Sequence, residues 1–165
     1  MNKNILKAVV AGSLVASLGL GSTAAHAAQA DATAKAKILR QVTVTNTTDL
    51  QFGTIVSSPT ASTVVVSTAG ARTCGAGLVC SAASTAAGFN VTGTSGQVVT
   101  VSVPASVRLT AGAGRFMDAD LATSATSLTL ASNAGSFSVG GTLYVKADQD
   151  DGDYAGTFRV TADYQ

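Results

Sequence analysis

The chemistry open to this chain is limited by the few reactive residue types that it contains. Its 165 residues include one histidine, two cysteines and no tryptophan, and all nine acidic residues are aspartates. The histidine, His26, lies in a leader that we expect to be removed. Without histidine, the mature chain cannot form a Ser-His-Asp or Cys-His nucleophilic site or a histidine-ligated zinc site. We therefore expect no enzyme, no catalytic or metal-binding residues and no cofactor.

The cysteines Cys74 and Cys80 lie six residues apart in RTCGAGLVCS. In an oxidising compartment such a pair most simply forms a local disulfide across a turn. The alternative is a redox-active or metal-binding pair, but the C-x-x-C spacing and a histidine co-ligand are both missing. The sequence favours the structural disulfide.

An acidic segment, Asp148–Asp153, is the strongest candidate for a metal ligand set. Calcium loops place oxygen ligands at alternate positions with a glycine sixth, whereas here Gly152 is fifth and no closing acidic residue follows. The alternative is a solvated turn in which Gly152 supplies a permissive backbone conformation. Both interpretations stay open at this point. A glycine-rich stretch, residues 112–115, lacks the lysine and Ser/Thr of a phosphate loop and is expected to be a turn.

The N-terminal residues predict export. MNKNILK is basic, AVVAGSLVASLGL is apolar, and small residues follow. Residues 1–27 are therefore expected to be a secretory signal peptide, cleaved after Ala27 or alternatively after Ala30. The mature chain has eight Lys and Arg against nine Asp, a net charge of −1. This balance gives no reason to expect nucleic acid as a partner, and no later segment is long and apolar enough to insert into a membrane.

Short stretches rich in Val, Thr, Phe and Tyr recur along the mature chain between turn residues, a pattern typical of β-strands. Gly140-Gly141 predicts a two-residue hairpin turn, and Ser95-Gly96 predicts a similar corner. The spacing favours an all-β sandwich without helices. The strands are expected at residues 38–46, 49–56, 62–68, 87–93, 97–103, 106–110, 127–132, 135–139, 142–147 and 154–165.

The last of these strands has the clearest alternation. Every second residue from Tyr154 is apolar or small, and most of the residues between them are polar. This period of two predicts a strand with one buried face that continues to the penultimate residue, Tyr164. The expected inward face consists of Tyr154, Gly156, Phe158, Val160, Ala162 and Tyr164.

Gly152 stands fourteenth from the C terminus and Tyr164 second. A glycine and a penultimate aromatic residue at this spacing, with alternating apolar residues between them, resemble the C-terminal strand of chaperone–usher pilus subunits. GDYAGTFRVTADY and LQFGTI are similar to pieces of the spore-coat-U-like subunits of archaic pili. Over most of the mature chain, including TNTTDLQFGTIV and GSFSVGGTLYV, the sequence resembles a secreted family called domain of unknown function 4402.

The pilin resemblance implies an incomplete immunoglobulin-like β-sandwich that lacks its last strand. It implies a groove beside the C-terminal strand, from Gly152 to Tyr164, which a periplasmic chaperone fills first. At an outer-membrane usher, the N-terminal extension of the next subunit then replaces the chaperone, which is strand addition to an exposed sheet edge.

Residues 28–37 precede the expected domain, residues 38–165, and form a candidate donor strand. Alternate positions are apolar here, while Asp31, Thr33, Lys35 and Lys37 occupy the others. The alternative is a disordered or weakly helical leader, since Ala and Lys favour helix. The candidate donor residues are Ala30, Ala32, Ala34, Ala36 and Ile38.

The sequence thus predicts a structural subunit of a surface pilus that supports adhesion or biofilm formation. Its expected partners are neighbouring subunits, a chaperone and an usher, and it is expected to pass through the periplasm to the bacterial cell surface. The alternative is a self-contained secreted β-sandwich that binds a surface or carbohydrate and does not polymerise.

Overall fold

The computed structural model describes residues 27–112 and 114–165. The predicted signal peptide, apart from Ala27, lies outside the described residues. The chain divides between Ala36 and Lys37 into two units. Residues 27–36 contain no strand, and all their side chains are exposed. Lys37–Gln165 forms the compact unit.

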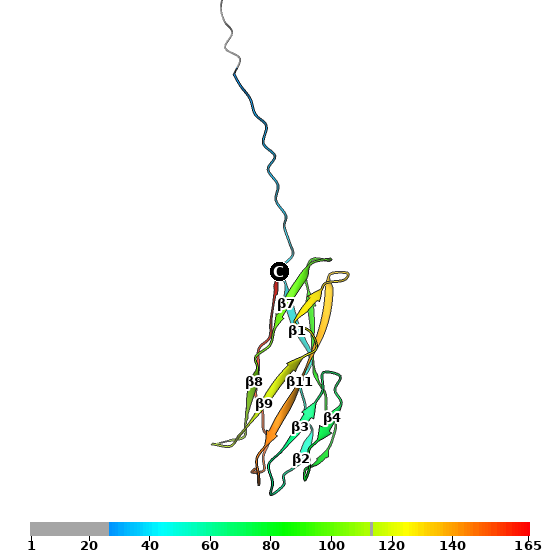
Figure 1. The fold of residues 1–165 in the computed structure, drawn as a ribbon, viewed down its shortest axis with the longest axis vertical. Helices are drawn as coiled ribbons and strands as arrows, with labels where there is room; N and C mark the ends of the chain where they lie inside the picture. The colour runs from blue at the N-terminus through cyan, green and yellow to red at the C-terminus, as the bar shows by residue number, and fades with distance from the viewer. Residues whose placement is uncertain (1–26, 113) are drawn as a thin grey trace, which may run out of the picture. The chain divides into compact units, whose positions relative to one another are not determined.

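The compact unit consists of antiparallel sheets (Figure 1). The largest has the order β1-β6-β11-β3-β4, with β9 paired to β11 and β8 paired to β9. Its strands are β1 (Thr43–Thr48), β3 (Ser62–Val66), β4 (Arg72–Cys74), β6 (Ala87–Thr92), β8 (Ser106–Thr110), β9 (Phe116–Thr123) and β11 (Ala134–Val145). A second sheet has the order β10-β7-β12, with β7 at Val98–Ser102, β10 at Ser127–Thr129 and β12 at Thr161–Tyr164. β2 (Thr54–Val56) and β5 (Val79–Ser81) form a separate two-stranded ribbon.

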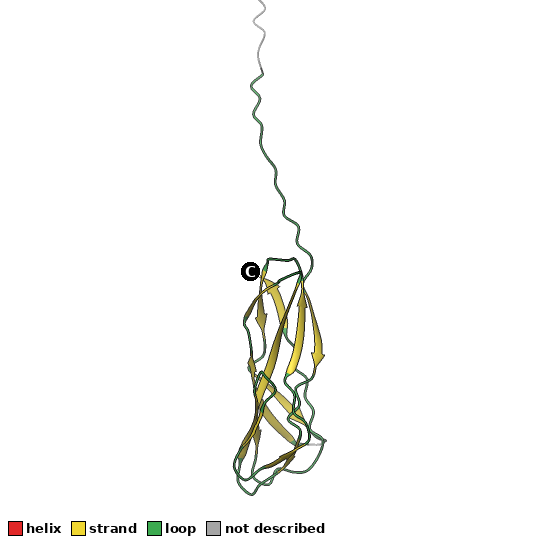
Figure 2. Ribbon diagram, turned by 90° about the vertical axis from the view of Figure 1, so that its right-hand side faces the viewer, coloured by secondary structure: helices red, strands yellow, loops and turns green. Residues whose placement is uncertain are grey.

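Only strands and loops occur in the described residues, so the prediction of an all-β sandwich is confirmed (Figure 2). Within that part of the chain, no helix has the length and hydropathy needed to cross a membrane.

β11 is one continuous strand, so the predicted hairpin turn at Gly140-Gly141 is wrong. Its first half, Ala134–Val139, pairs with β6, and its second half, Gly141–Val145, pairs with β3. The two glycines mark the change of partner. A Cβ on Gly140 would collide with the carbonyl oxygen of Val66, and one on Gly141 would lie 2.9 Å from that of Asp120. Glycine is needed here because neighbouring backbones approach closely, not because the chain reverses.

Other strand boundaries also differ from the prediction. β4, β5 and β9 were not expected, and of residues 49–56 only Thr54–Val56 forms a strand. The first strand begins at Thr43 rather than at residue 38. The sequence did not predict β9 because FMDADLAT contains two aspartates, which are rare in strands. Both aspartates face away from the core, while Met117 and Ala119 are buried.

Two groups of buried side chains form the core. The β6–β7 cluster contains Ala87, Phe89, Val91, Val99, Val101, Leu130, Phe137 and Val139. The β3–β9 cluster contains Phe52, Val64, Val66, Leu78, Met117, Ala119, Leu143 and Val145. Phe89 and Phe137 stack with their ring centroids 5.1 Å apart. Strand β11 contributes to both clusters, with Phe137 and Val139 in the first and Leu143 and Val145 in the second, so this strand connects them.

The predicted disulfide between Cys74 and Cys80 is present, with their Cα atoms 6.2 Å apart. It joins β4, at the edge of the large sheet, to β5 in the ribbon. Both cysteines pack against the β3–β9 cluster. The bond therefore fastens the ribbon over one end of the core.

Candidate functional site

The C-terminal segment does not form the single long strand expected from residue 154 onward. Ala155 pairs with Thr110 at the end of β8, and β12 pairs with β7 from Thr161 to Tyr164. Between them, residues 156–160 make no hydrogen bond to another backbone group in the described part of the chain. The strand is interrupted because its neighbours β7 and β8 are themselves separated, and Pro104 between them has no N–H to donate.

Exposure along this segment still alternates from Phe158 to Tyr164. Four residues are half-buried and pack against the β6–β7 cluster: Phe158, Val160, Ala162 and Tyr164. The ring of Phe158 meets that of Phe89 edge to face, with the centroids 6.2 Å apart. The residues between them are exposed. The apolar row thus includes Phe158 and Val160, whose backbone, like the rest of residues 156–160, pairs with no strand in the described part of the chain.

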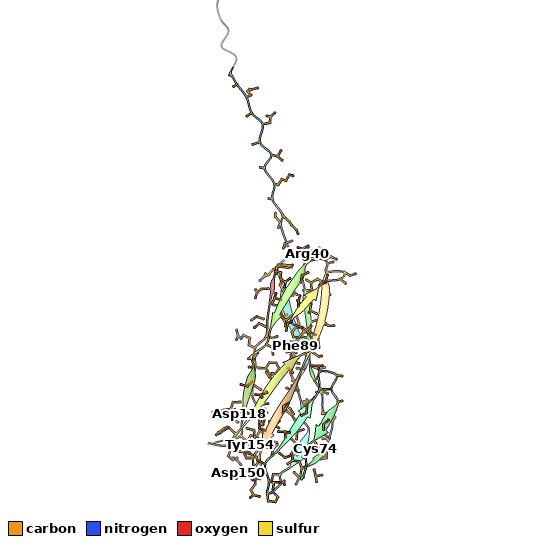
Figure 3. All side chains as sticks on the ribbon, viewed as in Figure 1. Arg40, Cys74, Phe89, Asp118, Asp150 and Tyr154 are labelled. Carbon is orange, nitrogen blue, oxygen red and sulfur yellow. A yellow bond between two sulfur atoms is a disulfide. The ribbon has the colours of Figure 1, made fainter. Side chains whose placement is uncertain are left out.

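The other three residues of the predicted row lie differently. Tyr154 packs against the β3–β9 cluster at the opposite end of the domain from Arg40 (Figure 3). Gly156 is exposed, and a Cβ on it would collide with the carbonyl oxygen of Arg108 in β8. Gly152 lies in the preceding turn with a φ of 152°. Only the residues from Phe158 onward face the β6–β7 cluster.

Tyr164 fastens the end of the chain to the point where the domain begins. Its hydroxyl donates to the carbonyl oxygen of Arg40 at 2.7 Å and accepts the N–H of Thr94 at 2.7 Å. The N–H of Arg40 in turn donates to the hydroxyl of Thr94. Gly93 makes room for the tyrosine, since a Cβ there would lie 2.5 Å from its hydroxyl. These contacts explain why the penultimate aromatic residue is a tyrosine.

Sequence reasoning missed Arg40, Gly93 and Thr94 as partners of Tyr164. They come from two segments that are far from the C terminus in sequence, and none stands in a recognisable motif. The one available signal was the hydroxyl of the penultimate residue, since a half-buried tyrosine usually finds a hydrogen-bond partner.

β1 has a free edge next to the same core cluster. It pairs with β6 along one side, and within the described residues no strand pairs with the other. Val42 and Val44, like Phe158, are half-buried against the β6–β7 cluster. We call the free edges of β1 and of residues 156–164 the open side. Its two borders are joined near the C terminus by the hydrogen bond from Tyr164 to Arg40.

The predicted donor residues are not part of any sheet. Ala30, Ala32, Ala34 and Ala36 lie in the extended unit, residues 27–36, and are exposed. Ile38, at the start of the compact unit, is 92% exposed. An isoleucine of this exposure leaves almost its whole apolar surface in water.

The acidic segment Asp148–Asp153 forms a turn whose backbone is held by other parts of the domain. The N–H of Asp148 donates to the carbonyl oxygen of Ser58, and Arg115 donates to that of Asp151. The hydroxyl of Tyr154 donates to the carbonyl oxygen of Asp150. Across the described residues, no three His, Cys, Asp or Glu side chains converge as a metal site would require.

The chain was also compared with known proteins. No curated protein and no solved structure is similar enough to count as a match. One family model, described as "Domain of unknown function (DUF4402)", matches residues 42–164, from just before β1 to the end of β12. Because this match covers well over half of the chain, the protein belongs to the DUF4402 family.

Proposed function

We propose that this protein is a structural subunit of a surface pilus, assembled when the N-terminal extension of one copy adds a strand to the open side of the next. The observation that carries the proposal is the backbone of residues 156–160, which has no hydrogen-bonded backbone partner among the described residues although Phe158 and Val160 are half-buried there. Unpaired strand edges are places where another chain can pair. An edge next to an incompletely covered core gains from both main-chain pairing and side-chain burial.

The energetic gain of an added strand is substantial. A strand along residues 156–164 would form roughly one backbone hydrogen bond per residue, each contributing about 0.5–1.5 kcal/mol. Side chains of the donor would cover the exposed parts of Val44, Phe158 and Val160 at about 25 cal/mol per Å² of apolar surface. Together, the hydrogen bonds and the buried apolar surface would make the proposed assembly resist dissociation.

The N-terminal extension has the properties of such a donor. Residues 27–36 are extended and exposed, and Ala30, Ala32, Ala34 and Ala36 share one parity. Small side chains need only a shallow acceptor surface, and along the open side that surface consists of half-buried residues such as Phe158 and Val160, which pack against the β6–β7 cluster. Ile38 adds one bulky apolar group at the domain end of the extension.

The proposal places the protein at the bacterial cell surface after export through the periplasm. A periplasmic chaperone would cover the open side before assembly, and an outer-membrane usher would exchange the chaperone for the next subunit. In this account the pilus supports adhesion or biofilm formation, and the disulfide fits the oxidising compartment through which the chain passes.

The test is the behaviour of surface material from cells that express the protein. Strand-exchanged polymers should run as a ladder in SDS without heating and collapse to one monomer band on boiling. Deleting residues 28–36 should abolish the ladder, while the variant still folds. A full-length protein that remains monomeric at the cell surface, with or without the extension, would contradict the proposal.

The second candidate is a self-contained binding module that does not polymerise. It is favoured by the fastening of Tyr164 to Arg40 and Thr94, since the C-terminal strand is then already anchored in its own domain. If the protein is such a module, adding a donor peptide should leave its stability unchanged. If it is a pilus subunit, the peptide should raise its stability.

A further inference from the structure

Two of the eight aromatic residues stand apart from the core. Six pack within or against the two core clusters: Phe52, Phe89, Phe137, Tyr154, Phe158 and Tyr164. Phe116 on β9 and Tyr144 on β11 instead lie on the outer face of the large sheet, on the side away from the buried Met117, Leu143 and Val145. Tyr144 is 45% exposed. Phe116 is half-buried, so Tyr144 is the ring that this face presents to solvent. An exposed aromatic ring in a chain with so few of them points to a binding surface.

Polar side chains surround the two rings on this outer face. The register places Tyr144 opposite Thr63 of β3, and Asp118 of β9 opposite Arg108 of β8. Arg108 donates to both carboxylate oxygens of Asp118, at 2.8 and 3.2 Å. The hydroxyl of Tyr144 donates to the carboxylate of Asp120 at 2.7 Å. The tyrosine ring is therefore held in a fixed orientation.

The charged groups of the face hold one another in place. Arg108 lies over the ring of Phe116 at 4.2 Å from its centroid, and Lys146 lies over the same ring at 3.8 Å. Cations over an aromatic face are attracted by its quadrupole, so both long side chains lose freedom before any ligand arrives. Two cations and two carboxylates, Asp118 and Asp120, leave the face with no net charge.

A shallow depression of about 400 Å³ opens beside Tyr144. Its lining includes Ser62, Thr63, Asp118, Tyr144 and Lys146. These residues offer two hydroxyls, a carboxylate and an ammonium group next to an aromatic ring. Asp118 and Cys74, which ends the edge strand β4, lie on opposite sides of the domain (Figure 3).

We propose that this outer face binds a neutral saccharide. A pyranose ring has apolar C–H faces that stack on an aromatic ring, and hydroxyls that bond to carboxylate, ammonium and hydroxyl groups. Tyr144 is the stacking platform, and Asp118, Lys146 and Thr63 are the polar contacts around it. The balanced charge disfavours a phosphate or a strongly charged polymer as the ligand. The proposal stands independently of pilus assembly, because none of these residues borders the open side.

The test uses the mature full-length protein and the methyl glycosides of glucose, galactose, mannose and N-acetylglucosamine. An open, shallow site predicts a Kd on the order of 1 mM for at least one of them, measured by NMR chemical-shift titration. The shifts should centre on Thr63, Tyr144 and Lys146. Tyr144→Ala and Asp118→Asn should each weaken binding by about tenfold, which corresponds to the loss of one stacking or polar contact.

Val79→Ala is the matched control, since Val79 is 62% exposed on the ribbon strand β5. It should bind as the wild type does, and so should the variant without residues 28–36. No shift with any of the four glycosides at about 50 mM would overturn the proposal. Binding that Tyr144→Ala leaves unchanged would overturn it equally.

Discussion

Replacing Tyr164 by phenylalanine removes only the hydroxyl that fastens the C-terminal strand. The ring remains half-buried against the β6–β7 cluster, so the loss is confined to two hydrogen bonds, to Arg40 and from Thr94. The carbonyl of Arg40 is exposed and regains water, whereas the N–H of Thr94 is partly buried. With a net value of about 0.5–1.5 kcal/mol per bond, we expect a destabilisation of about 2 kcal/mol. For a domain of this size, the melting temperature should fall by roughly 6 °C.

Thermal unfolding followed by circular dichroism measures this loss, and hydrogen exchange locates it. In Tyr164→Phe the amides of Arg40 and Thr94 should exchange faster, because each depends on the network around the hydroxyl. Tyr154→Phe is a matched control, since that hydroxyl also makes two hydrogen bonds, at the other end of the domain. It should lower stability without altering exchange at Arg40. An unchanged melting temperature in Tyr164→Phe, with unchanged exchange at Thr94, would refute the fastening role.

Three further predictions concern other parts of the domain. Cys74→Ser should lower stability by roughly 2 kcal/mol without abolishing the fold, and thiol titration of the native wild type should detect no free thiol. Phe158→Ala should cost about 2 kcal/mol in chemical denaturation of the monomer, because the side chain is half-buried against Phe89, and an undiminished stability would place it outside the core. The hydrogen bond from Arg108 lowers the pKa of Asp118 below 3.8. The ion pair's contribution to the stability of the fold is therefore complete above pH 3.8 and is lost as the pH falls further. The stability difference between wild type and Asp118→Asn, measured against pH, should therefore shrink only in that acid range, and a difference independent of pH would contradict the ion pair.

The sequence predicts well what depends on local alternation. Strands near residues 62–66, 87–92, 98–102 and 106–110 follow from short stretches with β-branched or aromatic residues, and the disulfide follows from the spacing of Cys74 and Cys80. The clean alternation of the last residues correctly indicated which side chains face the core from Phe158 onward. In these places the local pattern and the tertiary packing agree.

The failures come from features that depend on partners distant in sequence. Gly140-Gly141 resembles a hairpin turn, but its conformation is decided by the backbones of β3 and β9 on either side. The last strand is interrupted at residues 156–160 because β7 and β8 separate beside it, which the alternation of the last strand itself cannot reveal. The outer face was missed for a similar reason, since Phe116 and Asp118 join Tyr144 on one face only when β9 pairs with β11.

The central claim is that the open side accepts an added strand, and exchange of the backbone amides of Phe158 and Val160 tests it most directly. The variant that begins at Lys37 would be mixed with the synthetic peptide AQADATAKAKIL, and amide exchange would be compared with and without it. At a hundredfold excess over its Kd, the peptide should stabilise the domain by about 2.7 kcal/mol. The N–H groups of Ala155 and Gln165 point toward β8 and β7, so those of Phe158 and Val160 point to the open side. Exchange should then slow by about a hundredfold at Phe158 and Val160.

The peptide with Ala34→Asp should protect these amides much less, since it would bring an unpaired charge against an apolar surface, whereas Lys35→Ala should protect them fully. Protection of the Phe158 and Val160 amides by the wild-type peptide is the predicted result. Fast exchange at these amides, unchanged by a large excess of peptide, would contradict the account.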